Sequence, residues 1–184
     1  MKILVIGDVV GKPGRKAVAA LLPGLRAERA YHLVICNGEN AAGGNGLTAK
    51  TAEELRAAGC DVVTNGNHVW DQRQFVEEIV GLDYCLRPLN LDPGAPGRGW
   101  LVRDEVLVVN AIGRVFMDEC DNPYRAVDEL LETLGSAAPR VRVLDWHAEA
   151  TSEKVAMGFH LDGDRKSTRL NSSHIQKSRM PSSA

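Results

Sequence analysis

The chain has 184 residues with 22 basic and 24 acidic side chains, which gives a formal net charge of −2, and 44% of its residues are hydrophobic. This composition is typical of a single globular domain and excludes a fibrous or wholly disordered chain. No apolar run approaches the roughly 20 residues of a membrane span, and Asp8 interrupts the first run too early for a signal peptide. We therefore expect a cytoplasmic protein without membrane contact. Its four cysteines form no Cys-x-x-Cys pair, so we expect buried thiols rather than a zinc clip or a disulfide framework.

The first third of the chain alternates strands and helices. Residues 2–6 form an aliphatic run that predicts a strand, and apolar residues at helical spacing predict a helix over 15–30. Residues 32–37 and 60–65 predict the second and third strands. Between them, Thr48 is the expected N-cap of a helix that Gly59 ends.

The third strand leads into the sequence VVTNGNHVWD, residues 62–71. Asn65-Gly66 is normally a hairpin signal, but a helix is expected near 72–80 and no returning strand follows. Farther on, two short strands meet at Asp104-Glu105 within 99–113, a helix begins at Pro123, residues 140–147 form a strand, and 148–161 form a helix. This order predicts an α/β layered domain with a mixed sheet.

Polar side chains follow four of the predicted strands. Asp8 follows the first, Glu39 and Asn40 the second, Asn67 and His68 the third, and His147 the strand at 140–147. Because the carboxyl ends of parallel strands share one edge of a sheet, we expect these six side chains to converge. Carboxylate, amide and imidazole groups suit Mn, Fe, Mg or Zn, and a carboxylate that bridges two cations supports in-line attack of water on phosphate.

Structural roles also fit these residues when each is taken singly. Asp8 fits a turn or a helix cap, Asn65-Gly66-Asn67 a plain turn, and His147 a core histidine. The segment GDVVGKPG is no Walker loop, because three rather than four residues separate Gly7 from Gly11-Lys12 and Pro13 stands where Ser or Thr would bind magnesium. Four successive strand ends with ligand side chains nevertheless favour a metal site.

Four motifs resemble, in the same order, those of the YmdB-like branch of the calcineurin-type metallophosphoesterases. They are GDVVGKPGR, NGENAAGG, TNGNHVWD and DWHAEATSEK, and the resemblance covers residues 1–163. It implies a layered calcineurin-like sandwich with mixed β-sheets, a dinuclear metal centre, and hydrolysis of phosphodiesters that include 2′,3′-cyclic nucleotides. Two divalent or mixed-valence ions are implied, with Fe or Mn preferred and Mg or Zn as alternatives.

The resemblance also implies a role for each candidate residue. Asp8 would bind the first metal, and Glu39 would bridge both metals. Asn40, Asn67 and His147 would serve the second metal, and His68 would donate a proton. The first motif, Asp8-Val9-Val10, lacks the histidine that is common in the wider superfamily, and Glu39 replaces the usual bridging Asp; both features suit this branch.

The sequence departs from the family pattern after residue 164. The family would continue into a Thr-His-Thr-His-like motif with two more metal-binding histidines, and residues 165–184 contain no such motif. We therefore predict that residues 1–164 are the N-terminal portion of a longer domain, incomplete at its C-terminus, and that 165–184 form a disordered tail of foreign origin. A basic arm that binds nucleic acid is the alternative for this tail.

The main hypothesis is therefore a metal-dependent phosphodiesterase whose activity is impaired in this chain. The alternative is a non-catalytic nucleotide- or RNA-binding regulator that uses the same cleft without turnover. A phosphodiester or cyclic nucleotide is the expected ligand, and a link to RNA and a homo-oligomeric state are further partner hypotheses.

Overall fold

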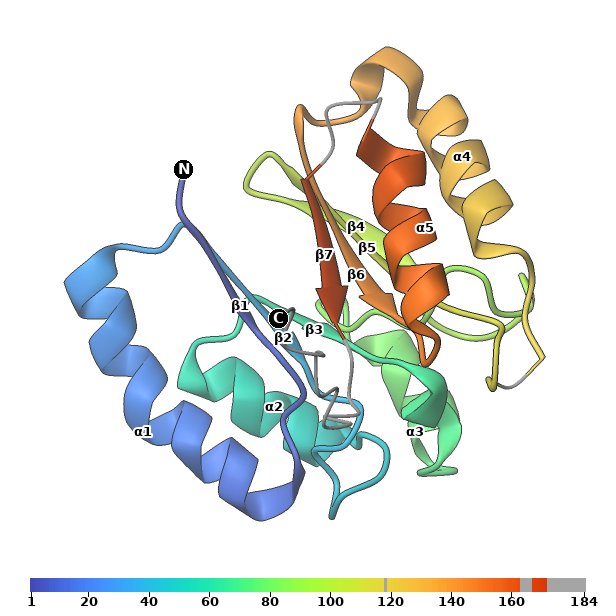
Figure 1. The fold of residues 1–184 in the computed structure, drawn as a ribbon. Coiled ribbons are helices and arrows are strands. Elements are labelled where there is room, and N and C mark those ends of the chain that lie inside the picture. Colours follow the sequence, from blue (N-terminus) through green and yellow to red (C-terminus); the bar gives the residue numbers. More distant parts are fainter. Residues whose placement is uncertain (118, 163–166, 172–184) are drawn as a thin grey trace, which may run out of the picture.

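The computed structural model describes residues 1–117, 119–162 and 167–171, the last five by their backbone alone. Two sheets lie face to face, with helices on the outer side of each, so the layers follow the order α/β/β/α (Figure 1). The predicted α/β layered sandwich is confirmed. Among the described residues, no helix has both the length and the hydropathy that a membrane span requires.

The first sheet consists of three parallel strands in the order in which the chain makes them. Its strands are β1 (Ile3–Ile6), β2 (Leu33–Asn37) and β3 (Val62–Thr64). Parallel neighbours require a crossover, and α1 (Gly11–Arg29) and α2 (Ala49–Ala58) supply the two crossovers on one face (Figure 1). Every residue of β2 and β3 is buried, as expected for strands covered on both faces.

Local signals fix the ends of these helices. Thr48 caps α2 in a reciprocal pair of hydrogen bonds with Thr51, and Gly59 ends the helix at φ 113°, where a side chain would be strained. The start of α1 was predicted too late, because the helix already begins at Gly11. Pro13 lies within its first turn, where the missing backbone N–H costs no helical hydrogen bond.

The second sheet contains four strands among the described residues, and the mixed pairing lies here. β4 (Trp100–Arg103) and β5 (Val106–Ile112) are antiparallel, whereas β6 (Val141–His147) and β7 (Ser167–Asn171) continue parallel to β5. Asp104 and Glu105 join β4 to β5 with φ of 49° and 63°, so the predicted turn is confirmed. Helices α4 (Pro123–Leu134) and α5 (Thr151–Asp162), with the short helix η3 (Gly135–Ala137), lie on the outer side.

The chain after β3 differs from the single helix expected near 72–80. It forms three short helices, η1 (Asn67–Trp70), α3 (Phe75–Glu78) and η2 (Ile79–Gly81). Buried Phe75 and Ile79 anchor the segment only over one turn, and hydrogen bonds between residues three apart dominate on either side. As predicted, Asn65-Gly66 leads from β3 into a helical segment rather than into the second strand of a hairpin.

Three apolar clusters hold the layers together. One fills the space between α1, α2 and the first sheet, and a second lies between the second sheet and α4 and α5. The third joins the sheets, with Ile35 and Val62 from the first and Val106 and Val108 from the second. The sheets are thereby fixed face to face, which brings strand ends from both into one region. Cys36, Cys60 and Cys85 are buried as predicted, whereas Cys120 is partly exposed.

The segment predicted to be a disordered tail contains strand β7, Ser167–Asn171, paired with β6. The bonds of such a pairing come from the backbone, so an open strand edge accepts an extended segment of almost any sequence. The remaining tail residues, 165, 166 and 172–184, lie outside the described residues. The domain boundary at 164 and the foreign origin of the tail stay predictions.

Candidate metal centre

All six candidate residues lie at the carboxyl ends of strands. Asp8 follows β1, Glu39 and Asn40 follow β2, and Asn67 and His68 follow β3. His147 is the last residue of β6. Parallel pairing places the first three exits at one edge of the first sheet, and the packing of the two sheets brings the end of β6 to the same edge. The predicted convergence therefore follows from the fold.

Glu39 and His147 form a buried contact between the strand ends of the two sheets at this edge. The Oε1 atom of Glu39 lies 2.8 Å from Nδ1 of His147, and the two side chains are 0% and 1% exposed. Burial alone lowers the pKa of His147, but the hydrogen bond and charge of Glu39, together with Asp145 and Glu149, raise it above the ordinary value. Strand ends that lie far apart in the sequence are thus joined by a buried acid–base pair.

Gly66 explains how the Glu39 carboxylate fits beneath the turn after β3. A Cβ at Gly66 would lie 2.0 Å from Oε2 of Glu39 and 2.6 Å from its Cδ, far inside van der Waals contact. Only glycine therefore lets the backbone pass over the carboxylate at this distance. The turn then leads to Asn67, whose Oδ1 atom is buried.

Asp8 and Asn40 form a second contact within the cluster. The Nδ2 group of Asn40 donates a hydrogen bond of 3.0 Å to Oδ1 of Asp8. Burial raises the pKa of Asp8 and the charge of Glu39 adds to this, whereas the bond from Asn40 and the charges of His147 and His68 oppose it. These electrostatic influences show that residues from all four strand ends act on one another.

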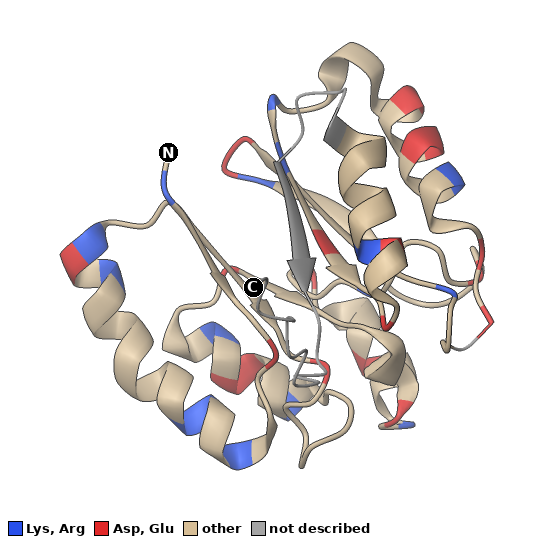
Figure 2. Cartoon of the chain, viewed as in Figure 1, with Lys and Arg blue, Asp and Glu red and all other residues tan. Residues whose placement is uncertain are grey.

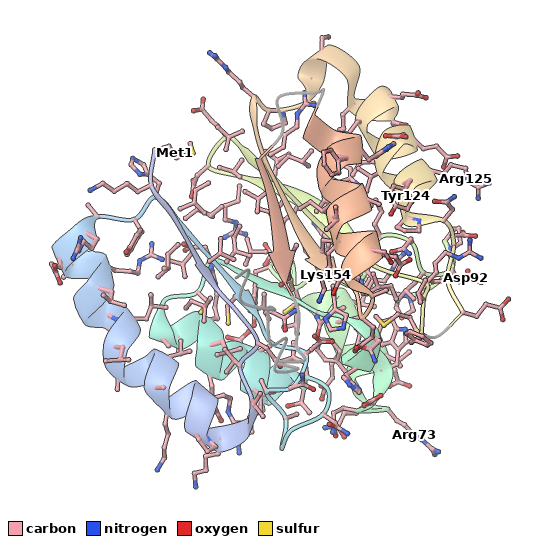
Figure 3. The ribbon with its side chains drawn as sticks, viewed as in Figure 1. Met1, Arg73, Asp92, Tyr124, Arg125 and Lys154 are labelled. Carbon is pink, nitrogen blue, oxygen red and sulfur yellow. The ribbon has the colours of Figure 1, made fainter. Side chains whose placement is uncertain are left out.

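His68 lies in η1 and faces a residue that the sequence reasoning did not select. Its Nδ1 atom is 2.7 Å from Oδ2 of Asp71, one turn farther along, and both side chains are partly exposed. This pair fixes the imidazole ring and leaves Nε2 as the nitrogen that can face a substrate. Arg73, two residues later, points away from the body of the protein and takes no part in the site (Figure 3).

The chemistry of this donor set fits divalent metal ions. Glu39 Oε2 and Asn67 Oδ1 are buried and accept no hydrogen bond from any described residue. A buried acceptor without a donor is costly, and a cation is a partner that removes the cost. Among the residues whose side chains the structure describes, no three His, Cys, Asp or Glu are gathered closely enough to hold an ion. The ligands instead pair with one another, so metal binding would exchange these pairings for metal bonds.

Comparison with known proteins places the chain in a family. The model of the YmdB-like protein family matches residues 4–178. The chain belongs to the YmdB-like family. The resemblance that the four motifs carry is confirmed, and the family match continues past the predicted boundary at 164.

Three relatives of this YmdB-like chain are informative. The chain is 40% identical over 180 residues to the 2′,3′-cyclic-nucleotide 2′-phosphodiesterase of Bacillus subtilis. The aligned region covers 96% of this chain and 68% of that protein. A hypothetical protein from Thermus thermophilus has a similar structure, with TM-score 0.84 and 42% identity over 93% of this chain and 67% of its own. A phosphatase from Mycoplasma pneumoniae matches with TM-score 0.84 and 31% identity, over 95% and 65%. The chain therefore spans about two thirds of the length of these relatives.

Sequence reasoning missed two carboxylates that lie against the candidate residues. Asp71 was missed although it follows His68 at helical spacing, which is the signal that would have found it. Asp145 lies two residues before His147 on the same face of β6, and it accepts hydrogen bonds from the Thr64 hydroxyl and, at 3.4 Å, from Asn37. Burial raises the pKa of Asp145, and those two hydrogen bonds oppose the rise. In this YmdB-like chain, Asp145 thus ties β6 to the first sheet beneath the Glu39–His147 pair.

Proposed function

We propose that this chain carries the metal centre of a phosphodiesterase that hydrolyses 2′,3′-cyclic nucleotides or related phosphodiesters. The observation that carries the proposal is the buried Glu39 carboxylate, which meets the end of β6 on one side and the glycine turn before Asn67 on the other. The 40% identity to a relative named as a 2′,3′-cyclic-nucleotide 2′-phosphodiesterase supports the same reaction class.

The side chains divide the work of metal binding. Glu39 would contribute to holding both ions, Asp8 would hold the first, and Asn40, Asn67 and His147 would hold the second. Fe or Mn suits this mixed oxygen and imidazole set, with Mg or Zn as alternatives. When bound, such ions supply the positive charge that holds the phosphate oxygens and promotes the ionisation of water. The site thereby needs no nucleophilic side chain.

His68 acts on the leaving group. The reaction forms a bond between the water oxygen and phosphorus and breaks one phosphorus–ester oxygen bond, and the departing oxygen needs a proton. His68 presents Nε2 while Nδ1 is held by Asp71, so the imidazolium can give that proton as a general acid.

The location in the cytoplasm and the oligomeric state stay predictions.

The test is hydrolysis of a 2′,3′-cyclic nucleotide with added Mn²⁺ or Fe²⁺, in the 184-residue chain and in the longest reading frame that contains it. We expect His68→Ala to lower kcat by about 10²–10⁴-fold while bound metal, measured by elemental analysis, is unchanged. If metal is bound but neither form hydrolyses the substrate above background, the proposal is wrong. A nucleotide- or RNA-binding regulator would instead bind its ligand with equal affinity before and after this substitution.

A further inference from the structure

A groove of about 640 Å³ runs between α1 and α2, on the outer face of the first sheet. Four basic residues line it, Lys12, Arg15, Lys16 and Lys50, against one carboxylate, Glu54. The rest of its lining is small and apolar, from Ala19 and Pro23 on α1 to Ala57 and Ala58 on α2. The groove is therefore positively charged at one end and uncharged at the other.

The charge of the groove is available to a ligand. Arg15 is engaged, because its Nε lies 2.6 Å from Glu54 and its Nη1 donates to the backbone carbonyl of Ala41. Lys12, Lys16 and Lys50 are exposed, and no carboxylate of the described residues lies within ion-pairing distance of them. The Glu54 carboxylate neutralises one of the four cations, so a net charge of about +3 faces solvent on an otherwise acidic chain.

The basic end of the groove adjoins the candidate metal centre. Helix α1 begins at Gly11, three residues after Asp8, and α2 follows the loop that carries Glu39. The hydrogen bond from Arg15 to Ala41 ties α1 to that same loop, two residues from Glu39. Figure 2 shows that both helices carry basic residues at these amino-terminal ends. A polyanion bound at the metal centre would therefore continue onto the lysines.

We propose that this groove binds the phosphate backbone of a single-stranded oligonucleotide whose scissile phosphodiester lies at the metal centre. This inference rests on the proposed function and names its substrate class. At its basic end the groove presents three lysines without an ion-pair partner in the described part of the chain, Lys12 and Lys16 from α1 and Lys50 from α2, which is more positive charge than the one phosphate of a cyclic mononucleotide needs. No aromatic side chain is among the described residues that line the groove, so it reads phosphate charge rather than bases.

The test compares two triple variants that lose the same charge. The groove variant carries Lys12→Gln, Lys16→Gln and Lys50→Gln, and the control carries Lys2→Gln, Arg98→Gln and Arg140→Gln, all exposed residues outside the groove. Binding of a fluorescent RNA of about 12 nucleotides, which is long enough to follow the groove, is measured by anisotropy at several salt concentrations in the presence of chelator, so that metal-dependent hydrolysis cannot occur. Hydrolysis of a 2′,3′-cyclic mononucleotide is measured in parallel.

We expect the groove variant to bind the RNA about tenfold more weakly than wild type. The slope of the logarithm of the binding constant against the logarithm of the salt concentration should become shallower by about 2, since each lost phosphate contact removes about 0.7 from it. The control should bind like wild type, and cyclic mononucleotide hydrolysis should be unchanged in both variants. Equal losses in both variants, or none in either, would overturn the proposal, and so would tighter binding of an acidic peptide of equal charge. Absence of mononucleotide hydrolysis both in this chain and in the longest reading frame that contains it, with metal bound and the groove effect intact, would refute the proposed function alone.

Discussion

Replacing Gly66 by alanine should destroy the metal centre from a position that offers no ligand. The added Cβ would lie 2.0 Å from Oε2, 2.6 Å from Cδ and 2.8 Å from Oε1 of Glu39, whereas ordinary contacts lie beyond 3.4 Å. The carboxylate or the turn must therefore move by more than about 1 Å. A shift of that size at a reacting centre costs about 10²-fold in rate.

The same substitution also affects stability. Glu39 is fully buried and held at 2.8 Å from His147, so it cannot swing into solvent. Overpacking of this kind costs about 1–3 kcal/mol in the free energy of unfolding. Gly24→Ala is the matched control, because a Cβ there meets nothing within 4 Å, and alanine within α1 should stabilise the protein by about 0.5–1 kcal/mol.

The assay combines bound Mn²⁺ per chain, thermal unfolding and hydrolysis of a 2′,3′-cyclic nucleotide. Gly66→Ala should lose most of the bound metal and about 10²-fold or more in rate, and Gly24→Ala should lose neither. If Gly66→Ala keeps the metal content and the rate of the wild type, then the close approach of Glu39 to this turn has no part in the site.

Two further predictions concern the carboxylates that accompany the candidate ligands. Asp71→Asn should lower kcat about tenfold with KM unchanged, because an amide cannot stabilise the charged His68 ring; a change confined to KM would contradict this. In the metal-free protein, the raised pKa of Asp145 means that its contribution to stability is full below its ordinary pKa of 3.8 and is lost as pH rises through the folded-state pKa. Asp145→Asn cannot ionise and so does not suffer this loss. With chelator present, the difference in Tm between Asp145→Asn and wild type should therefore grow in favour of the variant as pH rises above about 4. A difference in Tm that does not change with pH would argue against the buried charge.

The fold was predictable where signals are local. Thr48 and Gly59 mark both ends of α2, and Asp104-Glu105 marks the turn between β4 and β5, because caps and tight turns depend on a few neighbouring residues. The segment from Asn67 to Gly81 was harder, since apolar spacing does not distinguish one helix from several short ones anchored at Phe75 and Ile79.

The candidate site was predictable in its members and not in its contacts. Applied to the first sheet, the rule that parallel strands end at one edge selects Asp8 and Glu39 without a structure, but it does not reach His147, which ends a strand of the second sheet. It cannot show that Glu39 faces His147 from another sheet, or that Gly66 lies against the carboxylate, because both depend on how the sheets pack. The groove between α1 and α2 was missed for the same reason, since its lysines lie on two helices.

An anomalous difference map from crystals of this protein soaked in Mn²⁺ tests the metal centre most directly. We predict manganese density bounded by the carboxylates of Asp8 and Glu39, the amides of Asn40 and Asn67, and the imidazole of His147. Manganese bound elsewhere, with the Glu39–His147 pair still intact at 2.8 Å, would contradict this prediction.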